Sequence, residues 1–201
     1  MSCAIVVHGA IGSGKTNTCL RLAERANREE AAVGGIITLR QFQRGELMGY
    51  DCQEVASGRT FPLARLRENV EGPDWFEFGG LKYAFSLQGF ERANEILARS
   101  VQDLSRNAIV FVDEFGRLER AGLGLYEGAK RVAEGLGDGG VAVFSCHTDT
   151  VELVEGLVRN HAQAVLRFEP GDAELLWLTI KKRMRAPPRT LYDESKSKTS
   201  R

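Results

Sequence analysis

One stretch near the start of the chain, residues 9–16, limits the folds that the rest of the sequence can adopt. It reads Gly9-Ala10-Ile11-Gly12-Ser13-Gly14-Lys15-Thr16. The stretch fits the phosphate-binding pattern G-x-x-x-x-G-K-[ST] at every position. Its glycines let successive backbone N–H groups turn inward and form a concave site for an anion. Because such a loop joins a buried strand to the N-terminus of a helix, whose dipole adds positive charge, the pattern predicts strand, loop and helix in that order.

The residues on both sides of this loop agree with that order. Residues 3–7 form a short apolar run, which predicts a buried strand. After the loop we expect a helix from Gly14 or Lys15 to about Arg28, because apolar residues recur at helical spacing. These residues are Cys19, Leu22, Ala23 and Ala26. At the start of such a helix the Lys15 side chain reaches the terminal phosphates, and the Thr16 hydroxyl is placed to hold Mg²⁺.

Composition narrows the class of protein. The chain has 201 residues, of which 43% are apolar, so it is long enough to bury the core of one domain. Its 27 basic residues balance 27 acidic ones, which leaves no overall field that attracts nucleic acid. The four cysteines are scattered without a C-x-x-C pair, which argues against a zinc site or a disulfide framework and fits a reducing compartment. We expect a cytoplasmic protein without a signal peptide or a membrane span.

Apolar runs and amphipathic segments alternate along the rest of the chain. Strands are predicted at residues 33–40, 46–51, 83–86, 108–112 and 141–146. Helices are predicted at residues 91–105, 123–136 and 151–159. We expect Thr148 or Asp149 to cap the last of these helices. Residues 57–80 are interrupted by glycine and proline, and we interpret them as short strands and loops of a β-rich insert at about 41–86.

The C-terminal part is predicted to be a hairpin followed by a basic tail. Residues 164–168 and 174–180 flank the turn signal Pro170-Gly171-Asp172 and are interpreted as its two strands. Residues 181–201 carry eight lysines and arginines against two acids. We interpret this tail as solvated and disordered, with contact to RNA or another polyanion as the alternative. We therefore expect one domain at residues 1–180 and a tail at 181–201.

Strands that alternate with amphipathic helices predict an α/β fold of three layers around a mostly parallel sheet. Ligands of such sheets bind outside the carboxyl ends of the strands, which is where the loop at residues 9–16 is expected. Polar residues at the ends of other strands therefore become candidates for the same site.

The strand predicted at residues 108–112 supplies the second half of a nucleotide site. This apolar run is followed directly by Asp113 and Glu114. We expect Asp113 to hold Mg²⁺ through water, because phosphate-bound Mg²⁺ keeps several of its waters. Glu114 points elsewhere and is expected to orient or deprotonate an attacking water. Downstream of a complete phosphate-binding loop, this is the Walker B arrangement.

Other polar residues near the expected site have two interpretations each. His147 follows a buried strand and either senses the γ-phosphate or caps a helix. His8 either approaches the phosphates or packs under the loop. Arg117 is a candidate for positive charge at the leaving phosphate, with a surface ion pair as the alternative. The same alternatives hold for Arg40, Arg59 and Arg65. The guanine-selecting pattern N-K-x-D is absent from the sequence, so GTP specificity by that route is not expected.

Several segments, taken in order, resemble a known family. They are Gly9–Thr16, Gly34-Gly35-Ile36-Ile37-Thr38 with Arg40, Gly49-Tyr50-Asp51, Ser57-Gly58 with Leu63-Ala64-Arg65, and Asp113-Glu114-Phe115-Gly116-Arg117-Leu118-Glu119. Over about residues 4–150 the chain resembles the small P-loop nucleoside triphosphatases first characterised in thermophiles, also seen in animals as a cancer-related NTPase. The Gly-Gly strand and the D-E-x-G-x-x-E segment discriminate better than the loop, which many families share.

The sequence departs from this family's usual pattern in two places. Thr38-Leu39 stands where an acidic or Pro-Glu step usually precedes the arginine. Phe115 and Arg117 stand where isoleucine and lysine are commoner. Neither departure removes a catalytic group.

The resemblance implies a RecA-like core with an added strand and a catalytic glutamate. It also implies slow Mg²⁺-dependent hydrolysis of ATP, GTP and other nucleoside triphosphates, with little base selectivity. In this interpretation Lys15 and Glu114 are catalytic, and Thr16 and Asp113 hold the metal. The implied nucleotide-binding segments are Gly9, Ala10, Ile11, Gly12, Ser13, Gly14, Lys15 and Thr16, together with Ile109, Val110, Phe111, Val112, Asp113, Glu114, Phe115 and Gly116.

Two other functions stay open. A nucleotide or small-molecule kinase uses the same phosphate cradle, and the aromatic and basic residues of 57–85 would then form its acceptor pocket. Against a kinase, the sequence shows no arginine-rich lid. A slow nucleotide-dependent switch, whose partner reads the bound state, is the third hypothesis. Nucleoside triphosphates are the expected partners in all three, and the sequence carries no indication of an oligomeric state.

Overall fold

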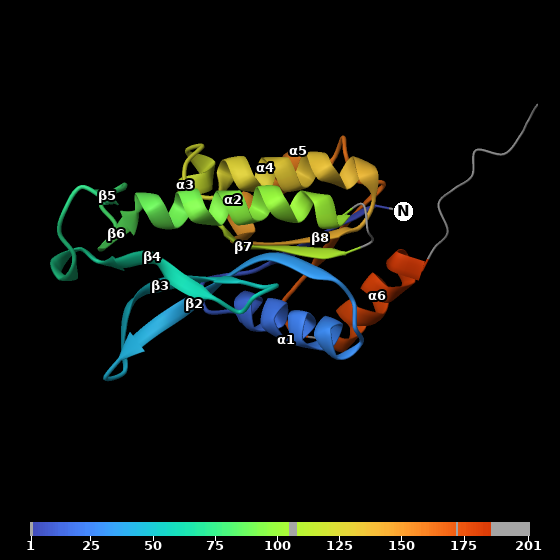
Figure 1. Ribbon diagram of the computed structural model, residues 1–201, viewed down its shortest axis with the longest axis horizontal. Coiled ribbons are helices and arrows are strands. Elements are labelled where there is room, and N and C mark those ends of the chain that lie inside the picture. The colour runs from blue at the N-terminus through green and yellow to red at the C-terminus, as the bar shows by residue number, and fades with distance from the viewer. Residues whose placement is uncertain (1, 105–107, 172, 186–201) are drawn as a thin grey trace, which may run out of the picture.

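The structure is a computed structural model, and it describes residues 2–104, 108–171 and 173–185. These residues form three layers, with helices on both faces of a central sheet (Figure 1). The three-layer α/β fold predicted from the sequence is therefore confirmed. Among the described helices, none is long and apolar enough to cross a membrane.

Nine strands of the described residues form one sheet, in the order β5-β6-β4-β3-β2-β7-β8-β1-β9. The strands β2, β7, β8, β1 and β9 run parallel and form the core half. The other half, from β3 to β5, is antiparallel and extends the same sheet. The bounds are β1 Cys3–His8, β2 Val33–Gln43, β3 Glu46–Glu54, β4 Thr60–Leu66, β5 Trp75–Glu77, β6 Tyr83–Ser86, β7 Ile109–Phe115, β8 Val141–Cys146 and β9 Ala164–Phe168.

The helices divide between the two faces of the sheet. Helices α2 (Leu87–Leu104), α3 (Arg117–Arg120), α4 (Tyr126–Gly135) and α5 (Val151–Val158) lie on one side, and α1 (Lys15–Arg28) and α6 (Ala173–Arg185) lie on the other (Figure 1). Short 3₁₀ turns occupy Arg67–Asn69, Leu136–Asp138 and Thr148–Thr150. Because helices cover both faces of the parallel half, the sequences of its central strands are continuous apolar runs.

Successive side chains of the central strands point to opposite faces of the sheet and therefore pack into two separate hydrophobic cores. In β7, Ile109 and Phe111 point to the α1 side, whereas Val110 and Val112 point to the α2 side, and all four are fully buried. Strand β2 approaches β7 closely at Gly35, where φ is +85° and a Cβ would collide with the carbonyl oxygen of Phe111. Glycine is therefore required at this position.

The predicted C-terminal hairpin is wrong. Residues 173–185 form helix α6, and β9 pairs in parallel with β1 at the sheet edge. Leu176, Trp177 and Ile180 are buried against the α1 side, whereas Leu178 is 55% exposed. This is the spacing of one helical face. The unbroken apolar run from 175 to 178 concealed it, since short apolar runs do not distinguish strand from helix.

Other boundaries differ less. The insert is confirmed as β-rich, but its strands continue the main sheet. Helix α4 begins at Tyr126 instead of residue 123, and α2 begins at Leu87 instead of residue 91. The N-cap of α5 is Thr150, without a side-chain hydrogen bond, so neither Thr148 nor Asp149 caps it. The predicted end of helix 91–105 and most of the tail, residues 186–201, lie outside the described residues, while 181–185 belong to α6.

Candidate active site

The loop at residues 9–16 follows β1 and leads into α1, as the pattern predicts. Gly12 and Gly14 adopt φ values of +83° and +96°, which side chains with a Cβ rarely adopt. Helix α1 begins at Lys15, and no side chain caps its start. The first backbone N–H groups of a helix have no partner within the helix. The start of α1 therefore offers donors and positive dipole charge to an anion.

Lys15 is held in the loop by three oxygen atoms. Its ammonium nitrogen donates to the carbonyl oxygens of Gly9 and Ala10, at 3.2 and 3.1 Å. It also pairs with Oε1 of Glu114 at 3.1 Å. The Lys15 side chain is only 4% exposed, whereas that of Glu114 is 35% exposed. The ammonium is therefore buried against the loop, with the Glu114 carboxylate on its accessible side.

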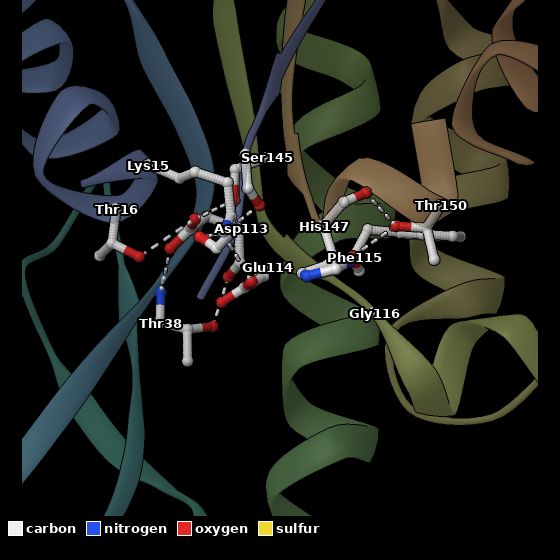
Figure 2. A network of polar contacts seen from close by, with 12 residues as sticks. Lys15, Thr16, Thr38, Asp113, Glu114, Phe115, Gly116, Ser145, His147 and Thr150 are labelled. Carbon is white, nitrogen blue, oxygen red and sulfur yellow. Dashed lines mark hydrogen bonds and ion pairs between the residues drawn. The ribbon is translucent and has the colours of Figure 1, made fainter. Parts of the chain in front are cut away.

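Asp113 is the fully buried carboxylate at the centre of the site. It ends the buried part of β7 and accepts a hydrogen bond from the backbone N–H of Thr38 at 3.0 Å. The hydroxyls of Thr16 and Ser145 also donate to it. Burial raises the pKa of Asp113 to about 6, and the hydrogen bond from Ser145 opposes that shift. Figure 2 shows α1, β2 and β8 each directing one of these partners at the carboxylate.

The oxygens of Thr16 and Asp113 suit a small divalent cation. The Thr16 hydroxyl lies 3.4 Å from Oδ1 of Asp113, at the mouth of the phosphate-binding loop. Mg²⁺ prefers oxygen ligands and is usually held by one or two protein groups plus phosphates and waters. No group of three or more His, Cys, Asp or Glu residues suited to a metal occurs among the residues that the structure describes. The donor set therefore fits a metal that arrives with its nucleotide.

Two cavities meet at Glu114. The loop cavity has a volume of about 490 Å³ and lies along the start of α1, between Gly12, Thr16, Leu20 and Phe42. The ring-lined cavity has a volume of about 340 Å³ and lies among β3, β4, β6, α2 and α3. Glu114 and Arg40 are the two residues that line both. A carboxylate in this position can act on a group approaching from either side.

The structure brings together the central residues predicted from the sequence. The loop, Thr16, Asp113 and Glu114 form one site at the carboxyl ends of β1 and β7. In the second predicted segment, the side chains of Ile109–Val112 and Phe115 are buried in the two cores and support the site from below. Gly116 lines the ring-lined cavity.

The arginines separate into three groups. Arg40 and Arg117 are exposed and line the cavities next to Glu114. Arg65 pairs with Asp51 and donates to the carbonyl oxygen of Tyr50, so it links β4 to β3. Arg59 is exposed and lines neither cavity.

The two histidines differ in position. The Nδ1 atom of His147 contacts the carboxylate of Asp149, and His147 forms the N-cap of the 3₁₀ turn at Thr148–Thr150. This contact lowers the pKa of Asp149. His147 also lines the ring-lined cavity. His8 is half-buried at the end of β1 and lines neither cavity.

Sequence reasoning assigned no role to three residues that shape the site. Thr38 and Ser145 hold Asp113, and Thr38 also donates through its hydroxyl to the Asp113 carbonyl oxygen. Glu119 is 4% exposed and accepts from the backbone N–H groups of Gly116 and Leu125, which fixes the segment after β7. A polar residue near the end of an apolar strand was the available signal for Ser145 and Thr38. Glu119 closes the D-E-x-G-x-x-E segment, but that pattern does not state which backbone groups the carboxylate holds.

Comparison with known proteins gives consistent results. Residues 4–187 match the family model described as NTPase. The chain is 27% identical to the nucleoside-triphosphatase THEP1 of Methanopyrus kandleri, over 89% of this chain and 88% of that protein. It is 29% identical to the protein of the same name from Methanosarcina barkeri, over 84% and 90%.

Two solved structures share the fold. The crystal structure of THEP1 from Aquifex aeolicus superposes with a TM-score of 0.65 and 18% identity, over 91% of this chain and 99% of that one. The solution structure of a human cancer-related nucleoside triphosphatase gives a TM-score of 0.64 and 21% identity, over 92% and 98%. At these identities the likeness shows the α/β fold alone.

Proposed function

From the premise that this chain belongs to the NTPase family whose model matches residues 4–187, we propose that it hydrolyses nucleoside triphosphates with Mg²⁺ and little base selectivity. The chain is a nucleoside-triphosphatase enzyme, as its matches with curated members of that name indicate. The products of the proposed reaction are the nucleoside diphosphate and inorganic phosphate. ATP and GTP are both substrates in this proposal.

The loop and Lys15 bind the phosphates. Lys15 and the uncapped start of α1, at Gly14 and Thr16, both line the loop cavity. Both attract a polyphosphate, through hydrogen bonds and through charge. Thr16 and Asp113 hold the metal, which when bound neutralises charge on the phosphate oxygens. Thr38 and Ser145 keep the Asp113 carboxylate in place by donating to it.

Glu114 prepares the attacking water. The single observation that carries this role is its position 3.1 Å from Lys15, next in sequence to Asp113 and open to solvent. A base must lie within hydrogen-bond reach of the proton that it accepts. A γ-phosphate bound to the Lys15 ammonium would lie beside this carboxylate. A water between the two can lose its proton to Glu114 as its oxygen attacks phosphorus.

Low base selectivity is supported by the apolar part of the loop cavity. Beyond the phosphate-binding end, Leu20, Leu39 and Phe42 line it, and the polar side chains of Asn17, Arg40 and Gln41 line it as well. The three apolar side chains carry no donor or acceptor that distinguishes one base from another, and the amides of Asn17 and Gln41 can both donate and accept, so neither amide selects one base by itself. We also place the activity in the cytoplasm, since Cys3, Cys19, Cys52 and Cys146 are all free thiols.

Phosphate release tests the proposal directly. Purified protein is incubated with ATP, GTP, CTP or UTP in Mg²⁺, in EDTA, and in EDTA followed by excess Mg²⁺. We expect slow release from all four nucleotides, its loss in EDTA and its return with Mg²⁺. Release that continues in EDTA would exclude the role of the metal. Release from one nucleotide alone would exclude low base selectivity.

A further inference from the structure

The ring-lined cavity is far larger than a hydrolytic site requires. Its volume of about 340 Å³ compares with the ~30 Å³ that one water occupies in the liquid. Of its lining residues, Gly116, His147 and Thr150 lie across Glu114 from Thr16 in Figure 2, whereas Thr38 lies on the Thr16 side. A site for water alone does not need this space.

Aromatic and aliphatic side chains form the body of this cavity. The rings of Tyr50 and Tyr83 meet edge to face with centroids 5.3 Å apart. Phe85 and Phe90 form a second ring pair at 6.3 Å. Leu63, Leu118 and Leu125 line it as well. Predominantly apolar walls with a few polar groups are typical of small-molecule pockets, and rings favour a flat apolar body.

The cavity also has charged lining residues, namely three arginines and the carboxylates of Glu114, Glu119 and Asp149. Arg40 and Arg117 line it, and within the described part of the chain neither takes part in an ion pair. Arg120 also lines it but is paired with Asp149 at 3.1 Å. Two unpaired guanidinium groups beside an apolar pocket attract an anionic substituent. The cavity therefore combines a ring-sized body with an anion-binding edge, next to the expected base.

We propose that the ring-lined cavity binds a phosphoryl acceptor, a small alcohol on a flat ring that also carries an anionic group. This inference rests on the proposed function, which places the γ-phosphate at Lys15. The acceptor's hydroxyl oxygen forms the new bond to γ-phosphorus while the bond to the β–γ bridging oxygen breaks. The nucleoside diphosphate leaves with that electron pair, and the hydroxyl proton passes to Glu114. Hydrolysis is the same displacement with water as the acceptor.

The nucleotide itself fits this cavity less well. The metal ligand Thr16 and the start of α1 lie on the loop-cavity side of Glu114, so the β- and α-phosphates extend that way. The sugar and base then lie beyond them. The opposite side of Glu114 is left for the attacking group, which is where the ring-lined cavity opens.

The test follows the label from γ-³²P-ATP with Mg²⁺ in the full chain. The probes are 4-(hydroxymethyl)benzoate and 6-(hydroxymethyl)-2-naphthoate, each a ring with one primary alcohol and one carboxylate. We expect a labelled phosphate ester with at least one probe, besides labelled inorganic phosphate. Inorganic phosphate as the sole product with both probes would overturn the acceptor proposal and leave hydrolysis standing. The absence of both products would contradict the proposed function and this inference together.

Variants locate the acceptor site. Tyr83→Ala removes a ring from the wall, and Arg117→Ala removes an exposed cation, so the second variant tests the site even if the first folds poorly. We expect each to lower the ratio of ester to inorganic phosphate at least tenfold. Tyr83→Phe should keep the ratio, since it keeps the ring. Arg131→Ala, on the exposed face of α4, is the matched control and should change neither product. An unchanged ratio in both test variants would place any ester formation outside this cavity.

Discussion

The ammonium nitrogen of Lys15 lies 3.1 Å from Oε1 of Glu114, so the phosphate-binding cation and the expected base neutralise each other before a nucleotide binds. A triphosphate must replace this carboxylate at the ammonium. Glu114 can move, because its side chain is 35% exposed, whereas Lys15 is held by two loop carbonyls. Nucleotide binding would therefore release the base at the place where the attacking group approaches.

Replacing Lys15 should separate phosphate binding from nucleoside binding. We expect Lys15→Ala to weaken Mg–ATP binding by about 10- to 100-fold, because it removes a charged hydrogen-bond donor to the phosphates. Adenosine binding should not change, since adenosine has no phosphate. Calorimetric titration of both ligands measures the difference. Lys130→Ala, at an exposed position of α4, is the control. Equal losses for ATP and adenosine would mean that the loop is not the phosphate cradle.

Substitutions in α6 distinguish the observed helix from the hairpin predicted by the sequence. Trp177 is 2% exposed and donates from Nε1 to the carboxylate of Glu29, the C-cap residue of α1, at 2.9 Å. We expect Trp177→Ala to lower the free energy of unfolding by about 3–5 kcal/mol. Leu178→Ala should change it by less than about 0.5 kcal/mol, because Leu178 is 55% exposed.

Urea denaturation followed by circular dichroism measures both changes. In a strand, residues 176, 178 and 180 would share one buried face. A loss for Leu178→Ala as large as that for Leu176→Ala would therefore support the hairpin against the helix.

Glu119 should give the protein a defined pH dependence. Burial raises its pKa above the ordinary value of 4.5. Between 4.5 and the raised pKa, the folded protein binds more protons at this residue than the unfolded chain does. Its contribution to stability is therefore largest below pH 4.5 and falls as the pH rises through the raised pKa. Glu119→Gln lacks this ionisation.

The free energy of unfolding of wild type minus that of Glu119→Gln should accordingly fall as the pH rises from 4.5 through the raised pKa. Urea titrations at several pH values provide it. The matched control is Glu127→Gln at an exposed position of α4, for which we expect a flat difference. A difference for Glu119→Gln that rises with pH would contradict the raised pKa.

Local patterns predicted the fold wherever one short segment determines its own structure. The loop at residues 9–16 requires a strand before it and a helix after it, and β1 and α1 follow. The run at 141–146 is apolar at every position, which is typical of a strand covered on both faces, and β8 is such a strand. The hairpin predicted for this C-terminal segment was wrong because the apolar face of α6 becomes evident only when α1 lies beside it.

Prediction of the site was limited by register. Asp113 and Glu114 follow a strand directly, so their place at the edge of the sheet could be inferred. The partners Thr38 and Ser145 come from β2 and β8, and their contact with Asp113 depends on how those strands align with β7. A single sequence does not state this alignment. The ring-lined cavity likewise needs the antiparallel half of the sheet to be folded against α2 and α3.

Phosphate release from ATP, GTP, CTP and UTP by wild type beside Glu114→Gln tests the central claim most directly. We predict slow release from all four nucleotides by the wild type and a fall of roughly 10² or more in the variant. Mg–nucleotide binding should persist or tighten, since the carboxylate that competes for Lys15 is gone. Glu95→Gln, at an exposed position of α2, should behave as wild type. Unchanged turnover in Glu114→Gln would remove this residue from the mechanism.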